Sequence, residues 1–145
     1  MTAEIDMMKL YSTRILALAA NMPRTERLTA PTASAKRRAP LCGSTVTVDI
    51  VLENGVIVDF GQDVKACALG QAAASVIGNA IVGLTPAQVE LGRNQMLAML
   101  KEDGPVPDAP FDGLEVLTPA KDYKNRHASI MLAFDATLDA LATNI

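Results

Sequence analysis

The two cysteines of the chain, Cys42 and Cys67, are the residues best suited to chemistry. Cys67 follows a strand pattern and precedes an Ala-rich helical pattern, and the backbone N–H groups at a helix start favour a thiolate. Lys65 adds positive charge nearby. Cys42 is followed by Gly43, which permits an unusual turn beside the sulfur. Two thiolates side by side would supply half of a tetrahedral zinc site, or two corners of an iron–sulfur cluster.

Other polar residues offer fewer candidates. His127 is the single histidine and lies at the start of the last predicted helix, which makes it a third candidate ligand. A lone histidine is, however, more often a surface or capping residue than a ligand. Asp135 and Asp139 lie four residues apart, and without a histidine spaced to join them they predict a solvated face. The basic run 36–38 likewise predicts a solvated face beside acidic neighbours.

A β-hairpin is expected to position both cysteines. Residues 45–53 alternate between apolar and polar side chains, which predicts a half-buried strand, and Asn54-Gly55 predicts a turn. A second apolar stripe follows the turn as far as Val64. The residues expected to form the sheet side of the core are Val48, Ile50, Leu52, Val58 and Phe60.

The expected register of this hairpin is the one that places the apolar residues of both strands on the same face. A two-residue loop would place Ile50 opposite an aspartate, which mixes the two faces. A three-residue loop with Gly55 in the left-handed region places Ile50 opposite Val58, so we expect a bulged turn. Extending that pairing brings Cys42 level with Ala66, one residue from Cys67. The two thiols are therefore expected to lie close together at the open end of the hairpin.

Helical patterns flank the hairpin. They cover the segments 4–22, 68–83, 85–104 and 125–142. The third opens with Thr85 as the N-cap and Pro86 as the first helical residue. The polar segment 24–40 contains Pro31 and predicts an edge strand or a loop. The order of helix, sheet and further helices predicts an α+β fold with an antiparallel sheet on one side and helices on the other.

The composition suits one globular domain, residues 1–145. Half of the residues are hydrophobic and 20% are charged. The net charge of −3 weighs against nucleic acid as a partner. Two cysteines cannot form a disulfide framework, which favours a reducing, cytoplasmic setting. No apolar run approaches the roughly 20 residues of a membrane span, and no phosphate loop, nucleophile elbow or two-histidine motif predicts an enzyme.

Three segments together resemble one known family. The segment "APLCGSTVTVDIVLENGVIVDF" is similar to a Cys-Gly-Asp motif followed by a strand and an Asn-Gly turn, and "KACALGQAAAS" is similar to Gly-Cys-Gly-x-x-x-Ala-Ser. The segment "ASIMLAFDAT" resembles a helix that begins with a third cysteine and continues Met-Leu-Ala. These motifs, in this order, are those of the U-type iron–sulfur cluster assembly scaffolds: IscU, SufU and the N-terminal domain of NifU. The resemblance runs from about Tyr11 to Leu141.

The resemblance places Cys42 and Cys67 at the first two cluster ligands. Ser44 stands where the family has an aspartate, and the third cysteine is absent. A gapless match puts Ser129 at the place of that cysteine. A shift of one residue puts His127 on the family's histidine and leaves an alanine at the cysteine. Both alignments stay open at this point.

The family further implies a three-stranded antiparallel sheet packed on one side by helices. The implied cargo is a transient iron–sulfur cluster or zinc, and the implied sulfur donor is a cysteine desulfurase. We expect an open site formed by Cys42, Cys67 and His127, with Cys67 accepting the sulfur. The family's Leu-Pro-Pro-Val-Lys segment is replaced by the charged residues 121–126, so binding of an Hsp70-type chaperone is expected to be weak or absent.

Two further hypotheses fit the same sequence. One is an adaptor with this fold that binds no metal and acts through protein contacts. The other is a thiol module in which Cys42 and Cys67 cycle between dithiol and disulfide.

Overall fold

The computed structural model describes residues 11–40 and 42–143. Three antiparallel strands form one sheet in the order β1-β2-β3. Their bounds are β1 (Ala33–Arg38), β2 (Thr45–Glu53) and β3 (Val56–Lys65). The strand β1 belongs to the segment that the sequence left open between an edge strand and a loop, and it is indeed at an edge.

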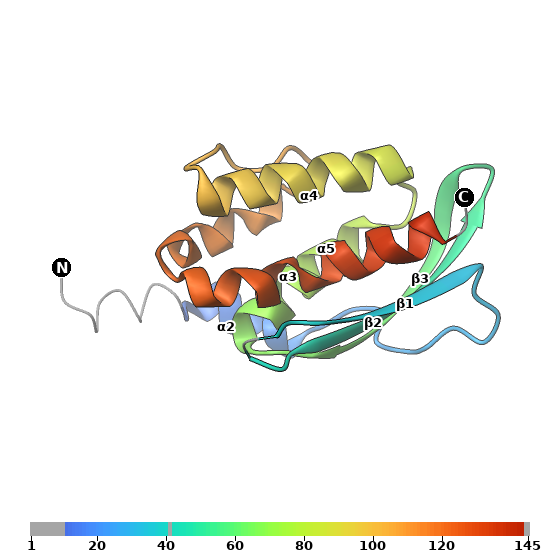
Figure 1. The fold of residues 1–145 in the computed structure, drawn as a ribbon, viewed down its shortest axis with the longest axis horizontal. Helices are drawn as coiled ribbons and strands as arrows, with labels where there is room; N and C mark the ends of the chain where they lie inside the picture. Colours follow the sequence, from blue (N-terminus) through green and yellow to red (C-terminus); the bar gives the residue numbers. More distant parts are fainter. Residues whose placement is uncertain (1–10, 41, 144–145) are drawn as a thin grey trace.

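Helices cover one face of this sheet. The helix α5 (His127–Ala142) packs across β1 and β2, and α3 (Ala68–Ala80) lies beside it against β3 (Figure 1). The helix α4 (Pro86–Lys101) packs on α5, farther from the sheet, and α2 (Thr13–Ala20) packs on α3. Together with the antiparallel sheet, this arrangement confirms the predicted α+β fold.

Two short 3-10 helices connect α4 to α5. They are η1 (Asp112–Asp122) and η2 (Lys124–Arg126). The predicted start of α4 is confirmed, because the Thr85 hydroxyl accepts from the backbone N–H of Gln88 in a capping box and Pro86 follows. The first residues of the predicted helix 4–22 lie outside the described residues.

The hairpin turn differs from the prediction. Asn54 and Gly55 both have positive φ, 52° and 76°, which defines a two-residue turn of the type that suits the strand twist. Next to the turn Leu52 pairs with Ile57, whereas Val51 already pairs with Asp59. The expected three-residue loop is therefore wrong. The extra residue lies one step later, as a bulge in β3.

This bulge decides which side chains enter the core. Beyond it Ile50 pairs with Phe60, so both lie on the same face and both are buried. Val48 is also buried, as predicted. Val58, the residue that the bulge leaves without a partner, is 40% exposed, so its placement in the core was wrong. Ile57, which is fully buried, takes its place, and Leu52 is half-buried at the edge of the core.

The opposite face of the sheet is partly covered by the segment that precedes β1. Asp49 on β2 is fully buried and accepts two hydrogen bonds from the Arg27 guanidinium, at 2.6 and 3.0 Å. The backbone N–H of Leu28 and the hydroxyl of Ser34 also donate to this carboxylate. The chain passes so close that a Cβ at Gly61 would lie 2.3 Å from a backbone oxygen of the segment.

Charged residues on α5 join the helix to its neighbours. Asp135 binds Arg37 of β1 at 3.3 Å and Arg93 of α4 at 3.1 Å, and Asp139 binds Arg37 at 3.1 Å. The two aspartates therefore form an ion-pair cluster rather than the solvated face expected from the sequence. Arg37 does lie beside acidic neighbours, as predicted for the basic run. Within the described residues, no helix is long and apolar enough to cross a membrane.

Candidate functional site

Cys42 lies in the tight turn between β1 and β2. Two backbone hydrogen bonds close this turn, from Ala39 N–H to the Ser44 carbonyl at 2.8 Å and from Gly43 N–H to the Ala39 carbonyl at 3.0 Å. Gly43 has a φ of +71°, a conformation that glycine adopts without strain. The turn leaves the Cys42 thiol exposed. Strand pairing stops at Thr45 and Lys65, so the expected level pairing of Cys42 with Ala66 does not form.

Cys67 is the N-cap residue of α3. Its backbone is extended, and its carbonyl accepts the first hydrogen bond of the helix, from Gln71 N–H at 2.9 Å. Its side chain caps no backbone N–H and is half-buried. The position at the start of a helix confirms the prediction from the sequence. The thiol is therefore free to interact with α5, which passes beside α3.

Two serine hydroxyls connect the two thiols. The Ser44 hydroxyl lies 3.0 Å from the Cys42 sulfur and 3.2 Å from the Ser129 hydroxyl, which donates to it. The Ser129 hydroxyl in turn lies 3.5 Å from the Cys67 sulfur. Ser44 is 6% exposed and Ser129 is 1% exposed. The turn before β2, the start of α3 and the first turn of α5 thus bring two sulfurs and two oxygens into one cluster.

The hydroxyls also affect the acidity of Cys42. Hydrogen bonds from the Ser44 side chain and then its backbone favour the charged thiolate and lower the pKa of Cys42 below its ordinary value of 9.0. A weaker contribution in the same direction comes from the Ser129 hydroxyl. The lowered pKa favours the thiolate, the nucleophilic form, at the exposed Cys42.

His127 does not join this cluster. Its ring is 4% exposed, and its Nε2 lies 2.9 Å from the Ala120 carbonyl, so Nε2–H is the donor. Residues two apart in a helix project about 200° from one another, and Ser129 is the residue that faces the thiols. His127 instead lines a separate pocket of about 460 Å³ beside Lys121 and Asp103. The predicted site of Cys42, Cys67 and His127 is therefore not assembled.

Of the two alignments left open by the sequence, the geometry favours the gapless one. Ser129 is near both thiols. Ser44, which the family pattern marks only as a departure from its aspartate, also belongs to the site. The signal for Ser129 was present, since a serine differs from the cysteine of the family pattern by one atom and occupies a similar volume. Within the described residues, no group of three or more His, Cys, Asp or Glu side chains could hold a metal ion. Any site here must use the hydroxyls or a ligand from elsewhere.

Comparison with solved structures agrees with this fold. The crystal structure of a nitrogen-fixing NifU-like protein (N-terminal) from Brucella abortus is 43% identical, covers 96% of each chain and superposes with a TM-score of 0.93. A crystal structure from Fervidobacterium islandicum AW-1, named as an iron–sulfur cluster assembly scaffold protein for the SUF system (FiSufU), is 19% identical. It covers 92% of this chain and 98% of its own, with a TM-score of 0.82. No protein-family profile and no curated protein matches the sequence.

The fold and the paired thiols define the U-type scaffold class. The identity and coverage of the Brucella structure extend the likeness from the fold to the sequence. The chain therefore belongs to the NifU-like N-terminal family of U-type scaffolds.

Proposed function

We propose that the chain is an iron–sulfur cluster assembly scaffold that takes its cargo at Cys42 and Cys67. The observation that carries the proposal is the contact of both thiols with one buried pair of hydroxyls, Ser44 and Ser129. The relative from Fervidobacterium islandicum, which shares the fold, is named as such a scaffold. The role is that of a carrier and not of an enzyme, and we assign it to the reducing cytoplasm, where thiols persist.

Ser129 takes the place that the sequence suggested for His127. Two thiolates and one serine oxygen provide three donor atoms from three different elements, and water or a partner's group can complete four-coordination. An oxygen donor binds zinc and iron less firmly than a thiolate does. The site is therefore open and holds Zn²⁺ or a small cluster weakly, as a scaffold that passes on its cargo requires.

Sulfur enters most readily at Cys42. The exposed thiolate attacks the terminal sulfur of a persulfide on the donor, a cysteine desulfurase. A new S–S bond forms on Cys42 while the S–S bond of the donor breaks and the donor cysteine leaves as a thiolate. The reaction needs no external oxidant or reductant. Cys42 replaces Cys67 as the expected acceptor because its pKa is lowered and its sulfur is exposed.

Binding of an Hsp70-type chaperone is expected to be weak here. The segment 121–126 is folded into the end of η1 and into η2, and Lys121 binds Asp103 at 3.1 Å. A chaperone that reads an extended, Pro-containing segment would have to unfold these turns first. The argument supports the prediction made from the charged sequence.

The proposal is tested by loading the protein without oxygen. Wild type and variants are treated with Zn²⁺, with Fe²⁺ plus sulfide, or with a cysteine desulfurase and L-cysteine. Metal per chain is measured by elemental analysis and sulfur uptake by the mass gain of one sulfur atom. We expect Cys42→Ser to lose sulfur uptake and both cysteine variants to lose metal. Ser129→Ala should weaken metal binding about tenfold, whereas Ser129→Cys should strengthen it.

His127→Ala is the matched control, because His127 starts the same helix as Ser129 but does not contact the thiols. It should load like wild type, with at most a loss of stability. A wild-type protein that takes up neither metal nor sulfur would contradict the proposal and favour the adaptor. Formation of a Cys42–Cys67 disulfide in place of loading would favour the thiol module.

A further inference from the structure

Three cations lie together on the outer face of the sheet, the face opposite the helices. Arg38 of β1 pairs with Thr45 of β2, which pairs with Lys65 of β3, so the three form one row across the sheet. Residues that pair directly in a sheet lie on the same face. Lys36, two residues before Arg38, lies on that face in the next row, where its partner Thr47 also pairs with Asp63, an exposed acidic residue. We call Lys36, Arg38 and Lys65 the cationic face.

These cations differ from the other arginines near the sheet. Arg27 binds Asp49, and Arg37 binds Asp135 and Asp139 from the helical side. In contrast, all three residues of the cationic face are exposed, and none has an ion-pair partner among the residues that the structure describes. With three exposed cations and the one carboxylate of Asp63, this part of the face keeps an excess of positive charge that a partner can meet, on a chain whose net charge is −3.

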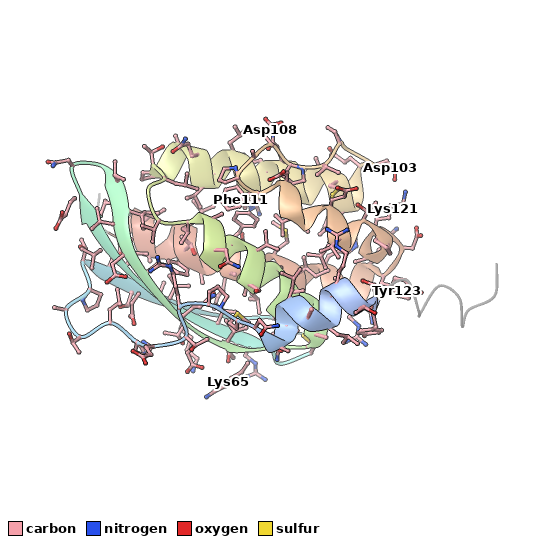
Figure 2. The ribbon with its side chains drawn as sticks, turned by 180° about the vertical axis from the view of Figure 1, so that it is seen from behind. Lys65, Asp103, Asp108, Phe111, Lys121 and Tyr123 are labelled. Atoms are coloured by element: carbon pink, nitrogen blue, oxygen red, sulfur yellow. The ribbon has the colours of Figure 1, made fainter. Side chains whose placement is uncertain are left out.

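The cationic face adjoins the thiols. The Arg38 guanidinium lies beside the turn that carries Cys42, since a Cβ at Gly43 would be 3.7 Å from its Nη2 atom. Lys65 is the last residue of β3, two positions before Cys67, and its side chain projects away from the helices (Figure 2). The segment around Arg27 covers the other half of this face through its bond to Asp49. In the half next to the thiols, Lys36, Arg38 and Lys65 are exposed among the residues that the structure describes.

We propose that the cationic face docks an acidic segment of the protein that delivers sulfur to Cys42. The inference rests on the proposed function and names the chemistry of the partner's contact surface. Opposite charge beside the acceptor thiol would orient the donor and raise its rate of encounter. Arg38, whose guanidinium lies beside the turn that carries Cys42, would contact the donor next to the thiol, and Lys36 and Lys65 extend the contact along and across the strands.

A protein segment fits this surface better than a nucleic acid does. Three strands span only about 10 Å at the usual spacing between strands, which suits a short acidic segment. A long polyanion would meet the excess negative charge of the remaining surface. The thiols at its margin also need a macromolecular partner that carries sulfur, and nothing in their chemistry requires a nucleic acid.

The test separates docking from the chemistry of the thiols. The double variant Arg38→Glu/Lys65→Glu is compared with wild type in sulfur uptake from a cysteine desulfurase and L-cysteine. It is also compared in cluster loading from Fe²⁺ plus inorganic sulfide without oxygen, which needs no docking. We expect the variant to lose about tenfold in the rate of desulfurase-dependent uptake at low salt. Loading from Fe²⁺ plus sulfide should be the same in both proteins. The difference between them in the rate of desulfurase-dependent uptake should shrink in 1 M salt.

The matched control is Arg14→Glu/Lys101→Glu, which makes the same change of charge on α2 and α4. It should take up sulfur from the desulfurase like wild type. Equal uptake by wild type and Arg38→Glu/Lys65→Glu at low salt would overturn the docking proposal while leaving the proposed function intact. So would an equal loss in the control pair, or binding of single-stranded DNA that depends on the cationic face. Failure of wild type to load even from Fe²⁺ plus sulfide would overturn both proposals.

Discussion

A hydroxyl group within hydrogen-bonding distance of a thiol changes the pH at which that thiol becomes a nucleophile. Ser44 lies 3.0 Å from the Cys42 sulfur and is itself held by Ser129, so its position is fixed by two elements. These hydrogen bonds stabilise the thiolate more than the thiol, which lowers the pKa of Cys42. The serine pair therefore links the reactivity of Cys42 to the packing of α5.

Ser44→Ala should raise the pKa of Cys42 toward its ordinary value of 9.0, because the largest cause of its lowering is removed. The measurement is the pH dependence of alkylation by iodoacetamide, followed by mass spectrometry on a Cys67→Ser background with Cys42 as the single thiol. The midpoint should move to higher pH in Ser44→Ala and by a smaller amount in Ser129→Ala. Superimposable profiles for Ser44→Ala and its parent would show that the hydroxyl has no such role.

At the scale of elements, the site depends on how closely α3 approaches α5. Gly70 lies in the first turn of α3, and a Cβ there would be 2.7 Å from the Ser129 hydroxyl and 3.0 Å from its carbonyl oxygen. The absence of a side chain at this position gives Ser129 room beside Cys67. Glycine is needed here for close packing and not for its backbone conformation.

Gly70→Ala is expected to displace Ser129 and to destabilise the protein by about 1–3 kcal/mol through overpacking. It should also weaken Zn²⁺ binding, which is measured by titration against a chelating dye. Gly113→Ala serves as the control, because a Cβ there would meet Val76 at an ordinary 3.4 Å. If both alanine variants retain wild-type affinity for Zn²⁺, the approach of α5 does not control the site.

The bulge in β3 determines the core in a similar way. Phe60 is 1% exposed, whereas Val58 is 40% exposed although only two residues separate them. Phe60→Ala should cost about 3–5 kcal/mol in the free energy of unfolding, because it empties a buried site. Val58→Ala should cost below about 0.5 kcal/mol, as an exposed substitution does. Denaturant titration measures both, and similar losses would mean that the bulge lies elsewhere.

The hairpin also shows how far the sequence could predict the fold. Alternation along 45–53 and the Asn54-Gly55 turn were sufficient for the strands, for their antiparallel pairing and for the burial of Ile50 and Phe60. The position of the extra residue was not predictable. A bulge in the strand and a longer loop both bring apolar residues onto one face, and only the backbone geometry at residues 54 and 55 separates them.

At the scale of the whole molecule, the limits of prediction for the site have a different cause. Cys42 and Cys67 were identified by their type and by their place at the ends of the hairpin. The third position depended on the rotation of α5 about its axis, which the sequence left open between His127 and Ser129. Packing of α5 against the sheet fixes that rotation, and it places the His127 side chain in a separate pocket.

The outer face of the sheet divides into two halves with different roles. One half carries the exposed side chains of the cationic face beside the thiols. The other half is closed by the segment before β1, which Asp49 holds through Arg27 and Leu28, while Ser34 of β1 also donates to this carboxylate. Arg27 is half-exposed, but the Asp49 side chain has no exposed surface. The stability of the closed half therefore depends on the charge of one buried carboxylate.

This dependence predicts how the whole protein responds to acid. The hydrogen bond with Arg27 is the largest cause that holds the pKa of Asp49 below its ordinary value of 3.8. A group whose pKa is lower in the folded than in the unfolded state stabilises the fold above the unfolded value and loses that effect as pH falls through the folded value. Asp49→Asn should therefore unfold about 2 kcal/mol more easily than wild type at pH 7. Below pH 3.8 the two free energies of unfolding, measured by urea titration at each pH, should converge. A gap that stays constant down to the acid transition would show that the carboxylate acts by its shape and not by its charge.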